Sequence, residues 1–150
     1  MKIWHFGSTS HARLATCHPK LQAVVNRALD LSLVDITVVS GYRSPAEQAA
    51  LYAQGRTEPG NIVTHVDGYK RKSRHNYDPA LAVDLAPYKA GKGIVWSDEV
   101  AWNQIRQAMV RAADELGVAL EWGGAWTRFV DKPHWQLKGT PSRLLRGVGQ

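Results

Sequence analysis

Two histidines and two aspartates of this chain stand in contexts that favour a hydrolytic metal site. His75 begins a segment that ends in the apolar run Leu81-Ala82-Val83-Asp84, and Asp131 precedes His134 near the end of the chain. Two imidazoles and one carboxylate leave a fourth zinc position open to water, and a second, unligated carboxylate can take the proton of that water. These residue types therefore point to metal-assisted hydrolysis.

The spacing of these residues fits a loop and two strands better than a single helix. Eight residues separate His75 from Asp84, and Asp131 lies on the approach to the strand-like run that contains His134. A lone histidine or aspartate in a loop is more often solvated or hydrogen-bonded than functional. The pattern by itself leaves a catalytic zinc site and a set of unrelated polar side chains equally open.

Helices and strands that can position these residues follow from periodicity, caps and turn residues. Ser44-Pro45-Ala46-Glu47 is a capping box with proline at the first helical position. The polar, basic stretch 56–77 is a long loop, which is typical of the border of a site. The other predicted elements are a helix over 18–31, a strand over 36–39, a helix from 44 that stops at 55, a strand over 80–85 closed by Pro87, a helix capped by Ser97 that stops at Gly117, a strand over 118–122, a turn at 123–124 and a last strand over 134–137.

This mixture predicts an α+β fold in which helices flank a small, mostly antiparallel sheet, because helices and strands do not alternate strictly. With 150 residues, the chain is expected to form a single domain over 1–150, with residues 139–150 as a flexible, poorly anchored tail. Cys17 is the only cysteine, which excludes an intrachain disulfide and a cysteine-rich zinc site. We expect it to be a small buried residue.

The balance of charge indicates an anionic partner. The chain has 19 Lys and Arg residues against 13 Asp and Glu, a net charge of +6. Nucleic acid, an anionic lipid surface and an acidic polymer all fit such a charge. No helix-turn-helix or finger spacing accompanies it, so nucleic acid is not the expected partner. The run Lys70-Arg71-Lys72-Ser73-Arg74 is either a solvated loop or an electrostatic guide toward an acidic polymer or an anionic envelope surface.

Five short motifs stand in order along most of the chain, from about residue 20 to 138: Ser40-Gly41-Tyr42-Arg43-Ser44, Ser73-Arg74-His75, Ala82-Val83-Asp84, Trp122-Gly123-Gly124 and Asp131-Lys132-Pro133-His134-Trp135. Their combination resembles the D-alanyl-D-alanine-type zinc peptidases, whose fold is Hedgehog-like. It is most similar to the VanY-like phage endolysins that act as L-alanyl-D-glutamate endopeptidases.

The resemblance implies a role for each matching residue. His75, Asp84 and His134 would bind one Zn²⁺, and Asp131 would be the general base. Arg43 would stabilise the developing oxyanion or hold a substrate carboxylate, and Ser73 would help to position the substrate. The spacing from His75 to Asp84 is longer than in many members of the family, which leaves the shape of the pocket near Tyr77 open. His65 is a weaker candidate ligand, since the other two histidines already have partners in the motifs.

The function that the resemblance implies is zinc-dependent cleavage of peptidoglycan stem peptides between L-Ala and D-Glu by a monomeric phage or prophage lysis enzyme. The N-terminus lacks the apolar region of a signal peptide, so synthesis in the host cytoplasm and action in the periplasm after membrane permeabilisation are expected. One alternative is a D,D-carboxypeptidase or dipeptidase acting on D-Ala-D-Ala. The other is a non-catalytic zinc-containing module that binds the cell wall.

Overall fold

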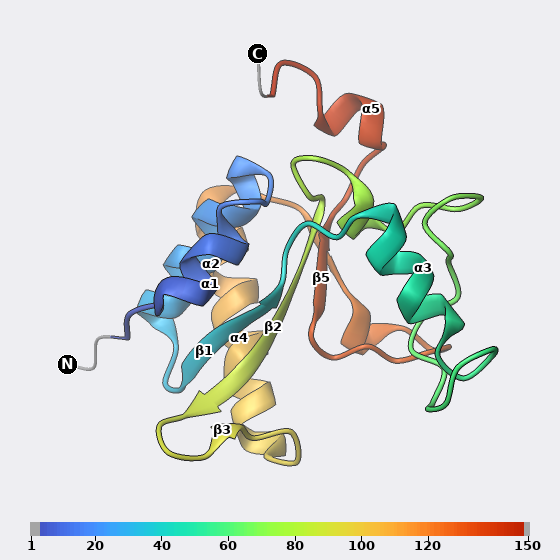
Figure 1. The fold of residues 1–150 in the computed structure, drawn as a ribbon. Helices are drawn as coiled ribbons and strands as arrows, with labels where there is room; N and C mark the ends of the chain where they lie inside the picture. Colours follow the sequence, from blue (N-terminus) through green and yellow to red (C-terminus); the bar gives the residue numbers. More distant parts are fainter. Residues whose placement is uncertain (1–3, 149–150) are drawn as a thin grey trace.

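The computed structural model describes residues 4–148, in which helices and short strands alternate irregularly along the chain (Figure 1). The elements are α1 (Ser8–Leu14), α2 (Pro19–Leu31), β1 (Asp35–Ser40), α3 (Pro45–Ala53), the 3₁₀ turn η1 (Arg74–Asn76), β2 (Ala82–Lys89), β3 (Gly93–Ile94), α4 (Glu99–Leu116), β4 (Leu120–Trp122), the 3₁₀ turn η2 (Gly123–Ala125), β5 (His134–Leu137) and α5 (Pro141–Leu144). No helix in this part of the chain is long and apolar enough to cross a membrane.

The strands form one antiparallel sheet in the order β1-β2-β5-β4, and β3 extends it by pairing with β2. This arrangement confirms the predicted α+β fold with a small antiparallel sheet. The central strand β2 pairs with β1 and β5 along its two edges, and its residues from 82 to 87 are mostly buried. β5 enters beside β2 from the end of the chain, so two segments that are far apart in sequence become neighbours.

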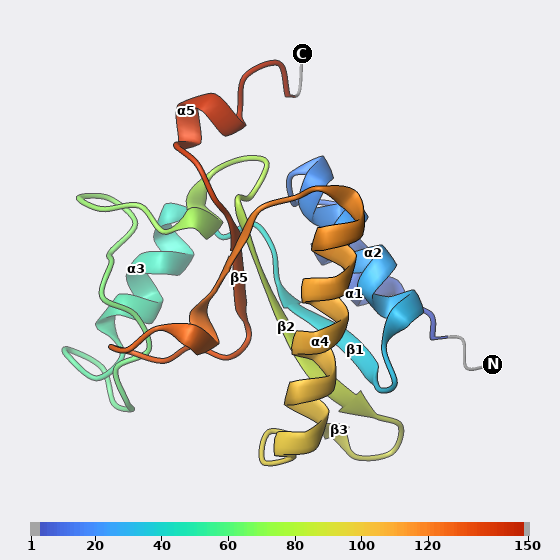
Figure 2. The same ribbon diagram turned by 180° about the vertical axis from the view of Figure 1, so that it is seen from behind.

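The hydrophobic core lies on one side of this sheet. Helices α1, α2 and α4 gather there, while α3 and the loop that follows it lie on the other side (Figures 1 and 2). The apolar faces of α2 and α4 pack against each other, and α4 also packs against β2. Fully buried members of this core include Leu21, Val25, Leu85, Ile105 and Met109. The sheet is therefore supported from one side and presents its other side to the site.

The helix caps bear out most of the predicted helix boundaries. Ser44 accepts from the Glu47 N–H while Glu47 accepts from the Ser44 N–H, which completes the predicted capping box of α3. Gly117 ends α4 in the left-handed conformation, with φ of 66°. At the start of α4 the prediction of Ser97 as the cap is wrong. Asp98 takes that place, because its carboxylate accepts from the Ala101 N–H at 3.0 Å.

Proline does not close the central strand, contrary to the prediction. β2 continues through Pro87 to Lys89. On one edge of β2, Pro87 faces β1. On the other edge, β5 pairs with residues 82–84 and β3 pairs with residues 88–89, so Pro87 lies in the gap between these two strands. A residue without an N–H is tolerated where the ladder is open on that side.

Both ends of the described chain are anchored more firmly than their sequences suggest. Residues 8–14 form α1, where the Ser10 hydroxyl accepts from the Val38 N–H at 3.0 Å. The expectation of a poorly anchored tail from residue 139 onward needs correction, since residues 141–144 form α5. Leu144 and Leu145 pack against the core, and the buried His18 hydrogen-bonds to the Leu144 carbonyl at 2.9 Å. Residues 149 and 150 of the expected tail lie outside the described part.

Candidate metal centre and active-site cavity

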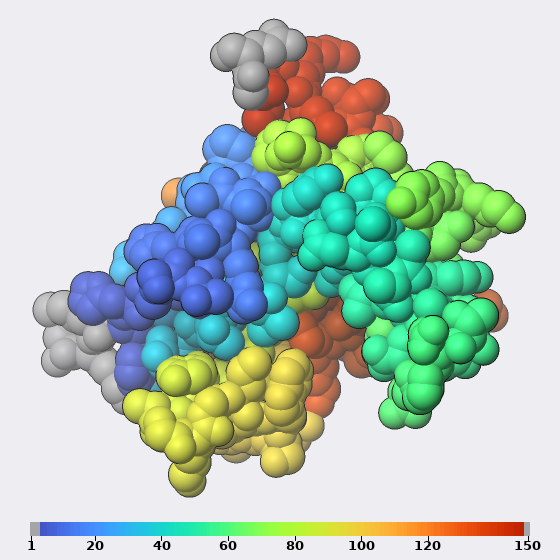
Figure 3. Space-filling view, viewed as in Figure 1, coloured from blue at the N-terminus to red at the C-terminus, as the bar shows by residue number. Residues whose placement is uncertain are grey.

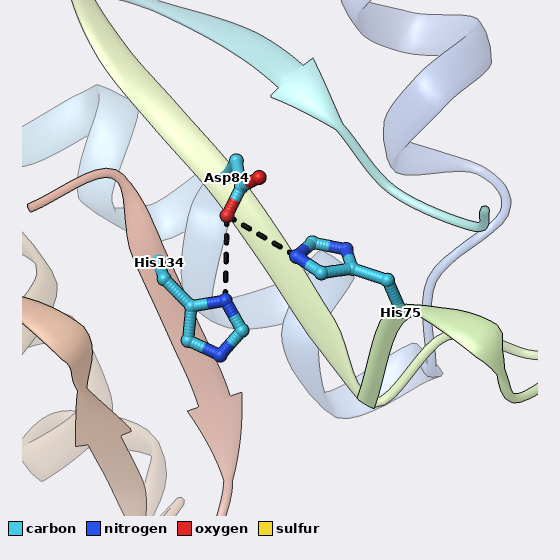
Figure 4. Close-up of side chains that lie close together, drawn as sticks. All are labelled: His75, Asp84 and His134. Carbon is cyan, nitrogen blue, oxygen red and sulfur yellow. Dashed lines mark hydrogen bonds and ion pairs between the residues drawn. The ribbon is translucent and has the colours of Figure 1, made fainter. Parts of the chain in front are cut away.

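His75, Asp84 and His134 converge on one point at the sheet surface (Figure 4). The Oδ1 atom of Asp84 lies 3.2 Å from Nε2 of His75 and 3.5 Å from Nδ1 of His134. The three candidate ligand atoms all lie within 4.8 Å of one another. Both imidazoles are buried and the carboxylate is half-buried. The structure thus brings together the three residues that the sequence motifs indicated as ligands.

The sheet and one short turn deliver these side chains. Asp84 on β2 is directly opposite His134 on β5 in the antiparallel register, so both side chains stand on the same face. His75 comes from η1, whose first turn is capped by the Ser73 hydroxyl accepting from the His75 N–H at 3.2 Å. Asp78 and Pro79, where the added length between His75 and Asp84 is expected to fall, do not line the cavity. The longer spacing therefore leaves the convergence of the ligands intact.

Each histidine ring is oriented by a partner on its far side. Nδ1 of His75 donates to the Gly41 carbonyl at 2.8 Å, and Nε2 of His134 donates to Oε1 of Gln136 at 2.8 Å. Position 41 requires a glycine, because the Cβ of any other residue there would collide with the Arg13 carbonyl. With the outer protons in place, the inner nitrogens are free to act as ligands, an arrangement that metal-binding histidines commonly show.

The electrostatics of this group fit a cation. Burial works to raise the pKa of Asp84, but the neighbouring His75 and His134 hold it well below its usual range. Burial alone would lower the pKa of His134, yet its hydrogen bond to Asp84 and the charge of that carboxylate raise it above the ordinary value. The Asp84 carboxylate thus stays ionised, and one nitrogen of each imidazole lies next to its Oδ1 atom. One divalent ion between the three groups satisfies all of them without added protons.

Asp131 lines the same cavity as the three candidate ligands and stands outside that group. Burial, and then the negative charge of Asp84, raise the pKa of Asp131 above its ordinary value. Its backbone N–H donates to the Gly123 carbonyl at 2.9 Å. A Cβ at Gly123 would press on the Asp131 backbone, which explains the glycine in the Trp122-Gly123-Gly124 motif. The Trp122-Gly123-Gly124 motif therefore helps to hold the backbone of Asp131 in place.

Arg43 is held beside the metal ligands by several partners. Its Nη2 atom lies 3.5 Å from Oδ2 of Asp84, and its Nη1 atom donates to Oε1 of Gln48 at 2.9 Å. Its backbone N–H donates to the carbonyl of His75 at 2.8 Å. Gln48 is completely buried and was not predicted as a site residue, because nothing in a helical run distinguishes an inward-facing amide. The structure reveals it as the partner that orients Arg43.

The cavity around these residues has a volume of about 1010 Å³. Ser73 and Trp126 line it, and the centroid of the Trp126 ring lies 5.1 Å from that of the His134 ring. Trp122 and Trp135 instead stack on each other by the last strands, with ring centroids 5.5 Å apart. His65 also lines the cavity but lies outside the candidate metal-ligand group.

Comparison with known proteins places the chain among peptidoglycan peptidases. The family described as phage L-alanyl-D-glutamate peptidase matches residues 2–140. The peptidoglycan L-alanyl-D-glutamate endopeptidase CwlK of Bacillus subtilis (strain 168) is 43% identical over 108 residues, or 69% of this chain. The match spans 61% of that relative, less than two thirds of its length.

Two further relatives match over most of their length. The L-alanyl-D-glutamate peptidase of Escherichia phage T5 is 37% identical over 121 residues, which cover 81% of this chain and 80% of that protein. The crystal structure of the Serratia marcescens L-Ala D-Glu endopeptidase ChiX superposes with a TM-score of 0.70 and 34% identity, covering 91% of this chain and 90% of that one. These matches confirm the resemblance inferred from the motifs.

Proposed function

This chain belongs to the phage L-alanyl-D-glutamate peptidase family, and from that membership we propose that it is a zinc-dependent peptidoglycan endopeptidase that cleaves the L-Ala–D-Glu bond of stem peptides. The observation that carries the proposal is the meeting of His75, Asp84 and His134 at one point, with Asp131 in the same cavity. Two nitrogen ligands and one oxygen ligand, with an unligated acid nearby, are typical of hydrolytic zinc sites.

When bound at this point, zinc supplies a Lewis acid and lowers the pKa of a bound water to about 7. Asp131 accepts the proton of the water whose oxygen attacks the L-alanyl carbonyl carbon. The bond from that carbon to the amide nitrogen then breaks, and Asp131 returns the proton to the nitrogen of the departing D-glutamate. The raised pKa of Asp131 suits the first half of this role, because a more basic carboxylate takes the proton more readily.

Arg43 and Ser73 complete the proposed machinery. The Arg43 guanidinium, held by Gln48, places a fixed positive charge beside the ligands, where it can share the charge on the carbonyl oxygen or bind a substrate carboxylate. Ser73 lines the cavity and also caps the turn that carries His75. We therefore propose that Ser73 contacts the substrate in addition to capping this turn.

The test is mass spectrometry of diaminopimelate-type peptidoglycan after incubation with the zinc-loaded protein. We expect new peptides that begin at D-Glu, absent after chelation and reduced about 10²–10⁴-fold in rate in the Asp131→Asn variant. Metal content of that variant, measured in parallel, should stay at the wild-type level. Release of terminal D-Ala alone would move the function to a carboxypeptidase, and unchanged muropeptides with metal bound would indicate a binding module.

We further propose that the exposed cations Lys70 and Arg71 guide the enzyme to the anionic cell envelope, after synthesis in the host cytoplasm and passage through a permeabilised membrane. Both lie on the surface of the loop before η1, and Asp67 accepts their backbone N–H groups at 2.9 and 3.1 Å. Exchanging both for Gln should lower the rate on intact walls at low salt and weaken its salt dependence. An unchanged salt dependence would leave them as solvated loop residues.

A further inference from the structure

Two loops from distant parts of the sequence bound the active-site cavity and touch each other. One follows α3 and contains His65, and the other joins η2 to β5 and contains Phe129. Both residues line the cavity, and their rings meet edge to face with centroids 4.6 Å apart and planes at 69°. In both ribbon views the tip of the second loop reaches the first (Figures 1 and 2). A side-chain contact therefore joins two walls of the cavity.

This contact lies at the outer rim of the cavity. His65 is exposed and Phe129 is 39% exposed, whereas the metal-ligand candidates His75 and His134 are only 2% and 6% exposed. The first loop projects with α3 from the rest of the molecule (Figure 3). The ligands are therefore the buried part of the cavity lining, and the His65–Phe129 contact is part of its exposed rim.

Each loop is anchored on both sides of its tip. The Gln48 side-chain amide donates to Oγ1 of Thr64 at 3.0 Å and to the carbonyl of Val66 at 3.1 Å, the residues that flank His65. In the other loop, the Asp131 N–H donates to the Gly123 carbonyl at 2.9 Å and so closes its base. The two tips are thus held toward each other by bonds outside the contact itself.

The backbone at the tip of the second loop is strained. Phe129 has φ of 52°, in the left-handed region, and is the one described non-glycine residue with positive φ. A residue with a bulky side chain rarely adopts this conformation, and such strain is concentrated at functional positions. Here the strained residue is the one whose ring makes the contact with His65.

We infer that His65 and Phe129 form a bridge over the groove that admits stem peptides with a free end and holds back cross-linked ones until it opens. This inference rests on the proposed function. On one side of the scissile bond the substrate leads to a glycan strand, and on the other it continues as a peptide that either ends or is joined to a second stem. Where this bridge closes the groove, a chain enters only by its free end, so a cross-linked stem requires an opened bridge.

The test compares cleavage of two soluble substrates, disaccharide-peptide monomers and their cross-linked dimers. The wild type should prefer the monomer. His65→Ala and Phe129→Ala should each raise the dimer-to-monomer ratio of kcat/KM about two- to tenfold, the factor that corresponds to loss of one aromatic pair. The double variant should add little to either single change, because both remove the same contact.

Matched variants separate the bridge from general damage to the loops. Phe129→Tyr keeps an aromatic ring and should keep the wild-type ratio. Tyr69→Ala removes an aromatic side chain that is 67% exposed on the same loop and does not line the cavity, so it should also leave the ratio unchanged. Phe129→Gly removes the ring and relieves the strained backbone together, and it should shift the ratio at least as far as Phe129→Ala.

The outcomes distinguish the two proposals. A wild type that cleaves monomer and dimer equally, or alanine variants with an unchanged ratio, would overturn the bridge and leave the endopeptidase function standing. A wild type that produces no D-Glu amino terminus from either substrate would refute the proposed function, and the bridge inference would fall with it.

Discussion

The residues of the candidate centre are held by contacts that point away from it. His75 is oriented by the Gly41 carbonyl, His134 by Gln136, and Arg43 by Gln48. Each functional side chain therefore reaches the centre with few rotamers left to choose from, which is the arrangement expected of a preorganised site. Substitutions of these outer partners should disturb the site through orientation, while substitutions of the inner residues remove chemistry.

Arg43 offers the sharpest test of a single charge. Arg43→Ala should lower kcat/KM on the soluble monomer by roughly 10²–10³, as removal of an electrostatic stabiliser does. Arg43→Lys keeps the charge but cannot satisfy Gln48 and Asp84 with a planar fork, so it should recover only part of the activity. Steady-state kinetics with metal content measured alongside checks this. Near-normal turnover in Arg43→Ala would remove Arg43 from the mechanism.

The single cysteine provides a second prediction at this scale. Burial raises the pKa of the Cys17 thiol to about 12, and Cys17 is 1% exposed. Because the thiolate is the reactive form, iodoacetamide should leave Cys17 unmodified in the native protein at pH 8 and alkylate it fully in denaturant. Intact mass before and after unfolding measures this. Rapid modification of the native protein at pH 8 would contradict the burial of this residue.

At the scale of elements, the start of α3 matters because the helix carries Gln48 close to Arg43. Ser44→Ala removes the side-chain half of the capping box and should lower the free energy of unfolding by about 1 kcal/mol, within the usual range for such caps. Urea unfolding measures the difference. Ser97→Ala is the matched control, since Asp98 rather than Ser97 caps α4, and it should change stability little. Equal losses in both variants would contradict this assignment of caps.

Elements with local signals could be predicted from the sequence, and those set by tertiary contacts could not. The capping box at Ser44 and the glycine at 117 are local, and both mark helix ends as predicted. In contrast, α1 is a polar seven-residue helix that depends on the bond from Val38 to Ser10, far along the chain. The passage of β2 through Pro87 likewise depends on which neighbouring strands happen to leave an edge open.

The candidate site was predictable to the extent that its residues carry recognisable chemistry. His75, Asp84 and His134 stood out as ligand types in ordered motifs, and the structure brings them together. Gln48 and Phe129 carry no such signal, because an amide in a helix and a phenylalanine in a loop are ordinary. Their importance arises only from where the fold places them, one buried against Arg43 and the other in contact with His65 at the rim of the cavity.

At the scale of the molecule, the candidate centre draws its ligands from three segments, two of which, β2 and β5, also pair with each other and contribute to the buried core. η1, β2 and β5 each contribute one ligand, while the buried core lies on the other side of the sheet among α1, α2 and α4. A chain of this length can bury a sufficient core without metal, so we expect metal binding to add stability to a structure that already exists. Any ligand that binds only the native state stabilises it by mass action.

Zinc should therefore raise the unfolding temperature of chelator-treated protein. At a free concentration of about 100 times Kd, the gain is about 2.7 kcal/mol, or roughly 5–10 °C for a chain of this size. His75→Ala and His134→Ala should fold but lose this shift, because each leaves two ligands. His65→Ala should keep it in full, since His65 lines the cavity without belonging to the ligand group. Thermal scans with and without zinc, checked by circular dichroism for native structure in each variant, measure these shifts. A full shift in His75→Ala, or its loss in His65→Ala, would mean that the ion binds elsewhere in the cavity.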